Sequence, residues 1–542
     1  MLFPVAYLLL TSLISLSGPV TARLPDGRLN ANHPPLPIVP KVTELQAGDI
    51  GPVTDVNGTE IPPYNTIYYF DQLIDHNDPS KGTFKVRYWT TWEYYKPGGP
   101  IILMTPGEVN AEAYWGYLTN RTINGQISKQ ENGATIVVEH RFYGLSNPYP
   151  DLSVKSFEVH TLDQAIEDFD YFARNVKLPF PGGDQVGPDK APWIFVGGSY
   201  SGALASWLKV AKPDTFYAAY SSSGVVQAFE NLWRYFEPIR EHMPANCSVD
   251  VQVVIEHVDQ VLSRTNTTAI DQLKDLFGLE VLSHLDDVAG ALRNDLWSWQ
   301  SLQPWSGPNT TFYQFCNALE VRDGASAPAS GWGLEHALSA WGNYFKTVTL
   351  PATCGDIDIE TCLGTYNPDD RSWTDTSIDN NFRSWFWTVC REFGWYQGGA
   401  PWGPTLVSRL IQPIYTERQC TLMFREAFSQ PPVPDTLRTD LKYHGWYVQE
   451  DRLFFANGHQ DPWRDATISA ETQHFVGTPR QPIEISNGFH CSDLRVSGRI
   501  DPTVAAVQDK ALASFKTWLA GWPKYEQELK LAVGGTPQAH GQ

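Results

Sequence analysis

The chain has 542 residues, of which 42% are hydrophobic and 13% aromatic, and its formal net charge is −20. This composition is too apolar for a disordered protein and can support a large core. The negative charge argues against a nucleic-acid partner, because phosphate recognition requires clustered Lys and Arg. A mean hydropathy of −0.31 excludes a polytopic membrane protein.

The first 22 residues are typical of a secretory signal peptide. An apolar run from Leu8 to Leu16 precedes a small-x-small cleavage site, Val20-Thr21-Ala22, and this run is too short to span a membrane. No other stretch reaches the roughly 18 apolar residues of a membrane anchor. We therefore expect a secreted protein, or one that enters an acidic compartment of the vacuolar or lysosomal type.

Sequons and cysteines agree with a secretory route. N-glycosylation is predicted at five Asn-x-Ser/Thr sequons, Asn57, Asn120, Asn246, Asn266 and Asn309. Six of the seven cysteines lie between Cys247 and Cys420, and Cys491 stands apart. We expect three disulfide bonds within the middle segment and a free Cys491, because most cysteines pair in oxidising compartments. The connectivity does not follow from the sequence alone.

The first part of the mature chain contains two different patterns. Residues 23–62 include Pro34-Pro35-Leu36-Pro37 and predict a propeptide or an extended arm. Residues 63–215 alternate short apolar runs with a helical pattern, which indicates a parallel sheet with crossovers. The predicted strands are 100–104, 134–139 and 193–196, and the predicted helix is 161–176.

Residues 216–440 lack this alternation and predict a helical insertion that contains six of the cysteines. Residues 441–530 return to the strand and helix pattern, and 531–542 are predicted to be a flexible tail. The expected helices of the insertion include 249–262 and 268–276; the later strands are 452–456 and 481–486, with a closing helix at 502–522. This layout favours one discontinuous α/β domain interrupted by a cap over several tandem domains.

A candidate nucleophile lies between a predicted strand and a predicted helix, in Gly197-Gly198-Ser199-Tyr200-Ser201-Gly202. A sharp strand-to-helix turn at this place exposes a serine hydroxyl at the carboxyl edge of a sheet. The usual pattern is G-x-S-x-G, and here Ser201 replaces the last glycine. The alternative interpretation is an ordinary Gly/Ser loop without catalytic function.

A nucleophilic serine needs a base, and the base needs an acid that orients it. Asp461 and His490 follow the two late predicted strands, in the chain order that this fold class uses. His459 is an alternative base, and Asp465 and Asp493 are alternative acids. Their competing role is loop capping or a supporting hydrogen bond.

Four motifs together show a family resemblance. They are Glu139-His-Arg-Phe-Tyr-Gly144, the string 197–202, Asn457-Gly-x-x-Asp-Pro-Trp463 and Gly488-Phe-His-Cys-Ser-Asp-Leu494. In this order they resemble the lysosomal Pro-Xaa carboxypeptidase and dipeptidyl peptidase II family of serine peptidases, most closely its secreted fungal acid prolyl endopeptidases, a branch that Thr105-Pro-Gly-Glu-Val109 also fits. The resemblance runs from about residue 64 to 518. It implies an α/β-hydrolase domain with a disulfide-linked helical cap, and a Cys390–Cys420 bridge.

The resemblance also implies roles for single residues. Ser199 falls on the nucleophile, Asp461 on the acid and His490 on the base. The pocket for the proline ring would be lined by Trp463 and Ala203. The oxyanion hole would combine the backbone N–H of Tyr200 with one from Gly107 or Glu108. The Glu108 carboxylate would meet a substrate amine, as in dipeptidyl members, or make a structural hydrogen bond.

The expected function is therefore hydrolysis of peptides and proteins on the carboxyl side of proline, through an acyl-enzyme and at acid pH, without cofactor or metal. Pro-Xaa carboxypeptidase or dipeptidyl peptidase action remains an alternative. Others are a lipase or esterase of the same fold and a non-catalytic, Trp-rich glycan-binding protein. Because an ordinary histidine is protonated in acid, we expect burial under the cap to lower the pKa of His490.

Overall fold

The structure is a computed structural model that describes residues 24, 28, 30–43 and 51–523. The predicted signal peptide (1–22) and the predicted tail (531–542) lie outside the described residues.

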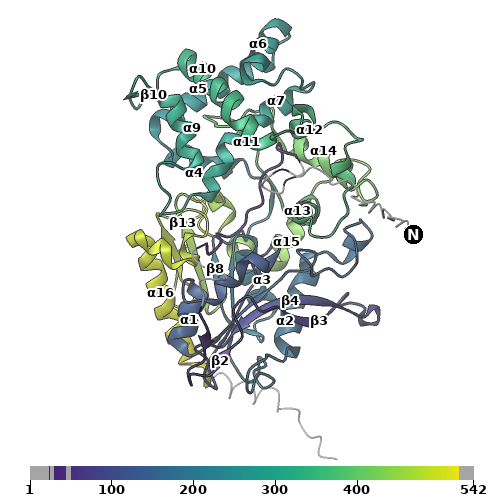
Figure 1. Ribbon diagram of the computed structural model, residues 1–542, viewed down its shortest axis with the longest axis vertical. Helices are drawn as coiled ribbons and strands as arrows, with labels where there is room; N and C mark the ends of the chain where they lie inside the picture. Colours follow the sequence, from purple (N-terminus) through teal and green to yellow (C-terminus); the bar gives the residue numbers. More distant parts are fainter. Residues whose placement is uncertain (1–23, 25–27, 29, 44–50, 524–542) are drawn as a thin grey trace, which may run out of the picture.

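An eight-stranded sheet forms the lower half of the molecule in Figure 1, in the order β14-β13-β8-β7-β5-β6-β4-β3. Its strands are β3 (Tyr68–Leu73), β4 (Thr83–Thr91), β5 (Ile101–Met104), β6 (Ala134–Val138), β7 (Trp193–Gly198), β8 (Phe216–Ser222), β13 (Leu453–Gly458) and β14 (Ile483–Ser486). Strand β4 pairs antiparallel with β3 and with β6, and all other neighbouring strands are parallel. Four long helices accompany it: α1 (Ile123–Glu131), α2 (Leu162–Asn175), α3 (Tyr200–Ala211) and α16 (Pro502–Leu519). This is the predicted α/β-hydrolase arrangement.

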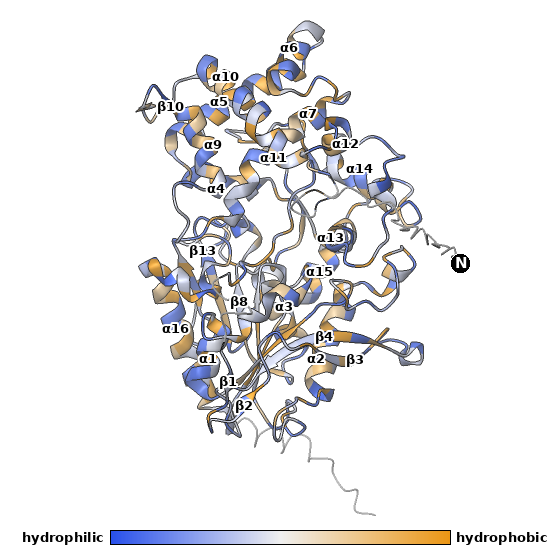
Figure 2. Ribbon diagram, viewed as in Figure 1, coloured by the Kyte–Doolittle hydropathy of each residue, from blue (hydrophilic) through white to orange (hydrophobic). Residues whose placement is uncertain are grey.

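The central strands are buried along their whole length, as expected for parallel strands covered on both faces. Figure 2 shows apolar residues concentrated on these strands and on the inner sides of the helices. Helix α2 illustrates the reason, because Leu162, Ile166, Phe169 and Phe172 recur at helical spacing and are all buried.

One predicted boundary falls inside the sheet. Strand β8 (Phe216–Ser222) pairs with both β7 and β13, although the sequence pattern places residue 216 at the start of the cap. Its second half, Tyr220-Ser-Ser222, is polar and does not look like a buried strand. The first part of the α/β domain therefore extends to Ser222.

The upper half in Figure 1 is the helical cap. Its helices are α4 (Glu237–His242), α5 (Ala245–Leu262), α6 (Thr267–Phe277), α7 (Leu285–Ala291), α8 (Asn294–Trp297), α9 (Thr311–Glu320), α10 (Leu334–Tyr344), α11 (Leu350–Cys354), α12 (Ile359–Leu363), α13 (Asn381–Thr388) and α14 (Pro413–Met423). Helix α15 (Thr436–Tyr443) instead contacts α3 of the sheet domain. Strands β9 (Phe229–Asn231) and β12 (Gly394–Tyr396) form a separate short parallel pair.

Three disulfide bonds join parts of the middle segment: Cys247–Cys316, Cys354–Cys362 and Cys390–Cys420. Cys491 is free and buried. Three bonds within the middle segment and a free Cys491 match the expectation from the sequence.

The sequons differ in exposure. Asn57, Asn266 and Asn309 are exposed, whereas Asn120 and Asn246 are half-buried. Glycosylation at these positions stays a prediction. Within the described ranges, every helix is too short or too polar to cross a membrane.

Candidate active site

Ser199 occupies the turn between β7 and α3 in a strained conformation. Its φ of 59° and ψ of −125° lie where a side chain is rarely found. Its N–H donates to the Ser222 carbonyl at 2.9 Å, and its own carbonyl accepts the Ala203 N–H at 3.0 Å. These bonds hold the residue at the carboxyl edge of the sheet, as the sequence pattern predicts.

Crowding explains the small residues around Ser199. A Cβ on Gly197 would lie 1.8 Å from the Ser201 carbonyl oxygen, and one on Gly202 would lie 2.6 Å from that of Ser222. Ser201, which departs from the usual pattern, bonds the backbone instead. Its hydroxyl donates to the Gly198 carbonyl at 2.8 Å and accepts the Gly198 N–H at 3.1 Å. The substitution therefore stabilises the turn.

Asp461 and His490 are in direct contact, on the loops that follow β13 and β14. Asp461 Oδ1 lies 2.8 Å from His490 Nδ1 and accepts the Trp463 N–H at 2.9 Å. Both side chains are buried. The carboxylate thus fixes the ring so that Nε2 is the atom left for a reaction.

The pKa of His490 differs from the sequence-based expectation. Burial alone lowers this pKa, but the Asp461 carboxylate, together with Cys491, raises it well above 6.5. The expectation of a lowered pKa was wrong because it counted desolvation without the buried negative partner.

Cys491, the residue after His490, lies beside Gly198, the residue before Ser199. The Cys491 N–H donates to Ser223 Oγ at 2.9 Å, and a Cβ on Gly198 would lie 2.9 Å from Cys491 Sγ. Ser199 Oγ and His490 Nε2 are both buried, and neither atom has a hydrogen-bond partner among the described residues. The structure therefore forms the acid–base contact but leaves the serine hydroxyl unbonded.

The rival residues have other partners. The Asp493 carboxylate accepts the Tyr220 hydroxyl at 2.7 Å and the Ser222 hydroxyl at 2.9 Å. Asp465 is within 4.0 Å of Arg234. His459 is half-buried, and burial followed by the nearby Arg464 charge lowers its pKa. Asp461 is thus the carboxylate that contacts the candidate base.

A small aromatic cavity of about 20 Å³ adjoins Trp463. Its lining includes Trp463, Trp385, Trp395, Phe382 and Phe386, and also Pro34 and Pro35. The Trp463 ring lies 6.4 Å from the His490 ring, and its Nε1–H donates to Gln300 Oε1 at 2.6 Å. Of these aromatic lining residues, the sequence predicted only Trp463. The aromatic density of 382–396 was a signal for the rest, but it did not indicate which face they share.

The other predicted residues lie near the site without completing it. Gly107 has a φ of 80°, and a Cβ on it would lie 3.4 Å from Tyr200 Cδ1. Glu108 is buried, and this burial raises its pKa to about 8, opposed by its own amide and by His490. Ala203 is fully buried in α3 and does not line the aromatic cavity.

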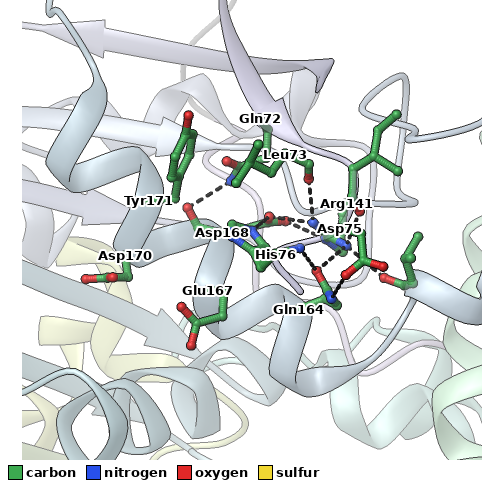
Figure 3. A network of polar contacts seen from close by, with 12 residues as sticks. Gln72, Leu73, Asp75, His76, Arg141, Gln164, Glu167, Asp168, Asp170 and Tyr171 are labelled. Carbon is green, nitrogen blue, oxygen red and sulfur yellow. Dashed lines mark hydrogen bonds and ion pairs between the residues drawn. The ribbon is translucent and has the colours of Figure 1, made fainter. Parts of the chain in front are cut away.

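The Glu139–Gly144 motif contacts Tyr200, the residue that follows the candidate nucleophile. Glu139 pairs with Arg87 at 2.7 Å. Arg141 binds Asp168 through Nε and Nη2, both at 2.6 Å, in the network of Figure 3. His140, between them, contacts the Tyr200 hydroxyl at 3.1 Å, so this motif braces the residue that follows Ser199.

Residues 72–510 match the family described as Serine carboxypeptidase S28. A serine protease, vicPb, from Bipolaris victoriae is 36% identical over 472 residues, which cover 83% of this chain and 88% of the relative. The lysosomal Pro-X carboxypeptidase of Homo sapiens is 30% identical over 492 residues, covering 85% and 90%.

A probable extracellular serine carboxypeptidase from Arthroderma benhamiae is 32% identical over 463 residues, covering 81% of this chain and 63% of the relative. Among solved structures, a proline iminopeptidase from Mycobacterium smegmatis is 11% identical, with a TM-score of 0.32, and covers 82% of this chain and all of its own.

Proposed function

The chain belongs to the serine carboxypeptidase S28 family and is a serine peptidase. We propose that Ser199, Asp461 and His490 form its catalytic triad. We also propose that it cleaves on the carboxyl side of proline. Membership in a peptidase family leaves the lipase, esterase and glycan-binding alternatives without support.

In the proposed mechanism Ser199 Oγ attacks the scissile carbonyl, while His490 Nε2 takes the hydroxyl proton and then gives it to the leaving amine. Asp461 orients the ring and stabilises the imidazolium, consistent with the 2.8 Å contact at Nδ1. Water then releases the acyl group by the reverse sequence. The Tyr200 N–H and the loop of Gly107 and Glu108 would bind the oxyanion, each donor contributing roughly 3 kcal/mol.

The observation that carries the proline preference is the aromatic cavity beside His490. Flat apolar walls suit a pyrrolidine ring, and two prolines of the chain itself, Pro34 and Pro35, line this cavity together with Trp463 and Trp395. A cleft of about 1260 Å³, lined in part by Pro35 and Val39, also extends past His490 toward Trp305. Its size supports room for substrate on both sides of the cleaved bond, and hence endopeptidase action.

The proposed location is outside the cell, and the proposed medium is acidic. Secretion agrees with the N-terminal sequence and with the extracellular relative. Action in acid is supported by buried carboxyl groups with raised pKa values, such as Glu392 at about 7, but the raised pKa of His490 opposes it. We therefore propose a protein stable in mild acid whose chemical step quickens as pH rises.

The test is digestion of a peptide library with purified protein, followed by identification of the cut bonds. Peptides blocked at both ends separate endopeptidase from carboxypeptidase and dipeptidyl action, because only an endopeptidase cleaves them. The control is Ser199→Ala. Cleavage without proline preference would overturn the specificity, and activity that survives Ser199→Ala would overturn the triad.

A further inference from the structure

Residues 30–43, called the N-terminal strap, run between the cap and the sheet (purple in Figure 1). Their first part is fixed to the cap. The Ala31 N–H donates to the Cys362 carbonyl at 2.8 Å, and Asn32 Nδ2 donates to the Leu363 carbonyl at 2.6 Å. Arg293 Nη2 donates to the Asn32 carbonyl at 2.7 Å. The strap is thus bound through its backbone as well as its side chains.

The next residues form part of the wall of the proposed proline pocket. Pro34 and Pro35 line the aromatic cavity with Trp463. Gln300 connects Trp463 to the strap. Its Oε1 accepts the Trp463 indole N–H at 2.6 Å, and its Nε2 donates to the Leu36 carbonyl at 3.1 Å. A peptide that placed proline in this cavity would meet the strap there.

The strap then passes the candidate nucleophile. Val39 is only 1% exposed, and a Cβ on Gly198, next to Ser199, would lie 2.8 Å from Val39 Cγ1. Hydroxyls of the sheet domain hold the strap beyond this point, Tyr114 on the Val39 carbonyl at 3.4 Å and Tyr117 on that of Pro40 at 2.7 Å.

We propose that the N-terminal strap is an intramolecular inhibitor that occupies the substrate cleft, and that the peptidase is latent until the strap is displaced or cut. Ser199 Oγ and His490 Nε2 are both buried with the strap in place, and a hydrolase must expose them to substrate. The assignment of these two residues rests on the proposed function. The overlap of the strap with the proline pocket rests on the proposed function as well.

Tethering makes this inhibition effective. A segment of the same chain acts at an effective concentration that is on the order of millimolar for short flexible links. The strap adds several backbone hydrogen bonds and buried apolar side chains to that advantage. Substrate at micromolar concentration would therefore not displace it.

The test compares two neighbouring strap residues in the full chain. Val39→Asp places a charge in a buried contact and should undock the strap; Ile38→Asp is the matched control, because Ile38 is 37% exposed. The readout is the rate at which a fluorophosphonate labels Ser199, a reaction that forms an Oγ–P bond and releases fluoride. We expect at least tenfold faster labelling of Val39→Asp than of the parent, and no more than a twofold change in Ile38→Asp.

Equal labelling of folded Val39→Asp and the parent would overturn the proposal. If Val39→Asp does not fold, the double variant Pro34→Ala/Pro35→Ala, which removes both proline rings from the cavity wall without adding charge, takes its place with the same expectation. The test separates this proposal from the proposed function. Faster labelling without cleavage after proline would support the inhibitory role of the strap and reject the proline specificity. Labelling that survives Ser199→Ala would reject the triad.

Discussion

At the scale of single residues, the contact with His490 distinguishes Asp461, the proposed acid, from its rivals. Asp461→Asn keeps the shape but removes the charge that selects the productive tautomer, so we expect kcat/KM on a blocked proline peptide to fall by roughly 10⁴-fold. Asp493→Asn is the matched control, because Asp493 binds Tyr220 and Ser222 instead. A loss at Asp493 as large as at Asp461 would contradict this assignment.

The same contact sets the pH dependence of the chemical step. Asp461 raises the pKa of His490 above its ordinary 6.5, so acid converts the base to imidazolium over a range that begins above that pH. We expect kcat/KM to fall on the acid side through a limb above pH 6.5, and Asp461→Asn to move that limb to lower pH. Steady-state rates from pH 4 to 9 measure both. A plateau that continues down to pH 5 would be inconsistent with a raised pKa.

At the scale of structural elements, the proposed proline pocket is lined by aromatic residues of α13 and β12. Trp395→Ala removes a wall of the cavity, and we expect kcat/KM for proline peptides to fall on the order of 10–100-fold, in the range that apolar pocket contacts supply. Fluorophosphonate labelling should not slow, because the triad is unaltered. Trp402→Ala is the control, since Trp402 is 70% exposed. Equal effects of the two variants would exclude this cavity as the specificity pocket.

The docked strap should loosen in acid because of His33. Its ring packs against Trp373, Phe382 and Phe386. Burial, followed by the charges of Arg28, Arg293 and Arg418, lowers its pKa to about 3. A free strap would protonate near the ordinary 6.5, so acid favours release, by up to about tenfold per pH unit between these values.

The measurement is fluorophosphonate labelling of the parent and of His33→Phe, which keeps an aromatic ring but cannot titrate. We expect the ratio of the parent rate to the variant rate to rise as pH falls from 6.5 to 4. Taking the ratio cancels the change in His490, which the two proteins share. A ratio that is constant with pH would show that His33 does not control the strap.

The sequence predicted elements whose signal is local, and it missed contacts between distant segments. The strand and helix on either side of Ser199, and the loops of Asp461 and His490, follow from apolar runs and turn residues. The cavity does not, because it joins 382–396 to Trp463 and to the strap. Likewise the composition of 23–62 predicts an extended arm, but no sequence pattern predicts that Val39 lies beside Gly198.

At the scale of the whole molecule, buried acids suit the fold to an acid medium. Burial raises the pKa of Glu108 to about 8, of Glu320, Glu392, Glu417 and Asp440 to about 7, and of Asp295 and Asp493 to about 6. A raised carboxyl pKa means that the folded chain holds protons that the unfolded chain has lost. Stability therefore falls as pH rises from about 4.5 through these values, by up to about 1.4 kcal/mol per pH unit for each such proton.

Buried histidines oppose this trend and limit it. The pKa of His33 is lowered to about 3, that of His140 to about 4, and that of His160 well below 6.5, so unfolding takes up protons below pH 6.5. The carboxyl groups with a raised pKa outnumber the histidines with a lowered pKa, so the balance favours acid.

We expect Tm to be higher at pH 5 than at pH 7.5, by on the order of 5 °C. Thermal unfolding of the Ser199→Ala variant measures this without self-digestion. In the same background Glu392→Gln, which replaces one titrating carboxyl by a neutral group of similar size, should reduce the difference, whereas Glu256→Gln on the exposed face of α5 should not. A Tm that peaks at pH 7.5 or above would mean that these carboxyl groups do not govern the stability of the fold.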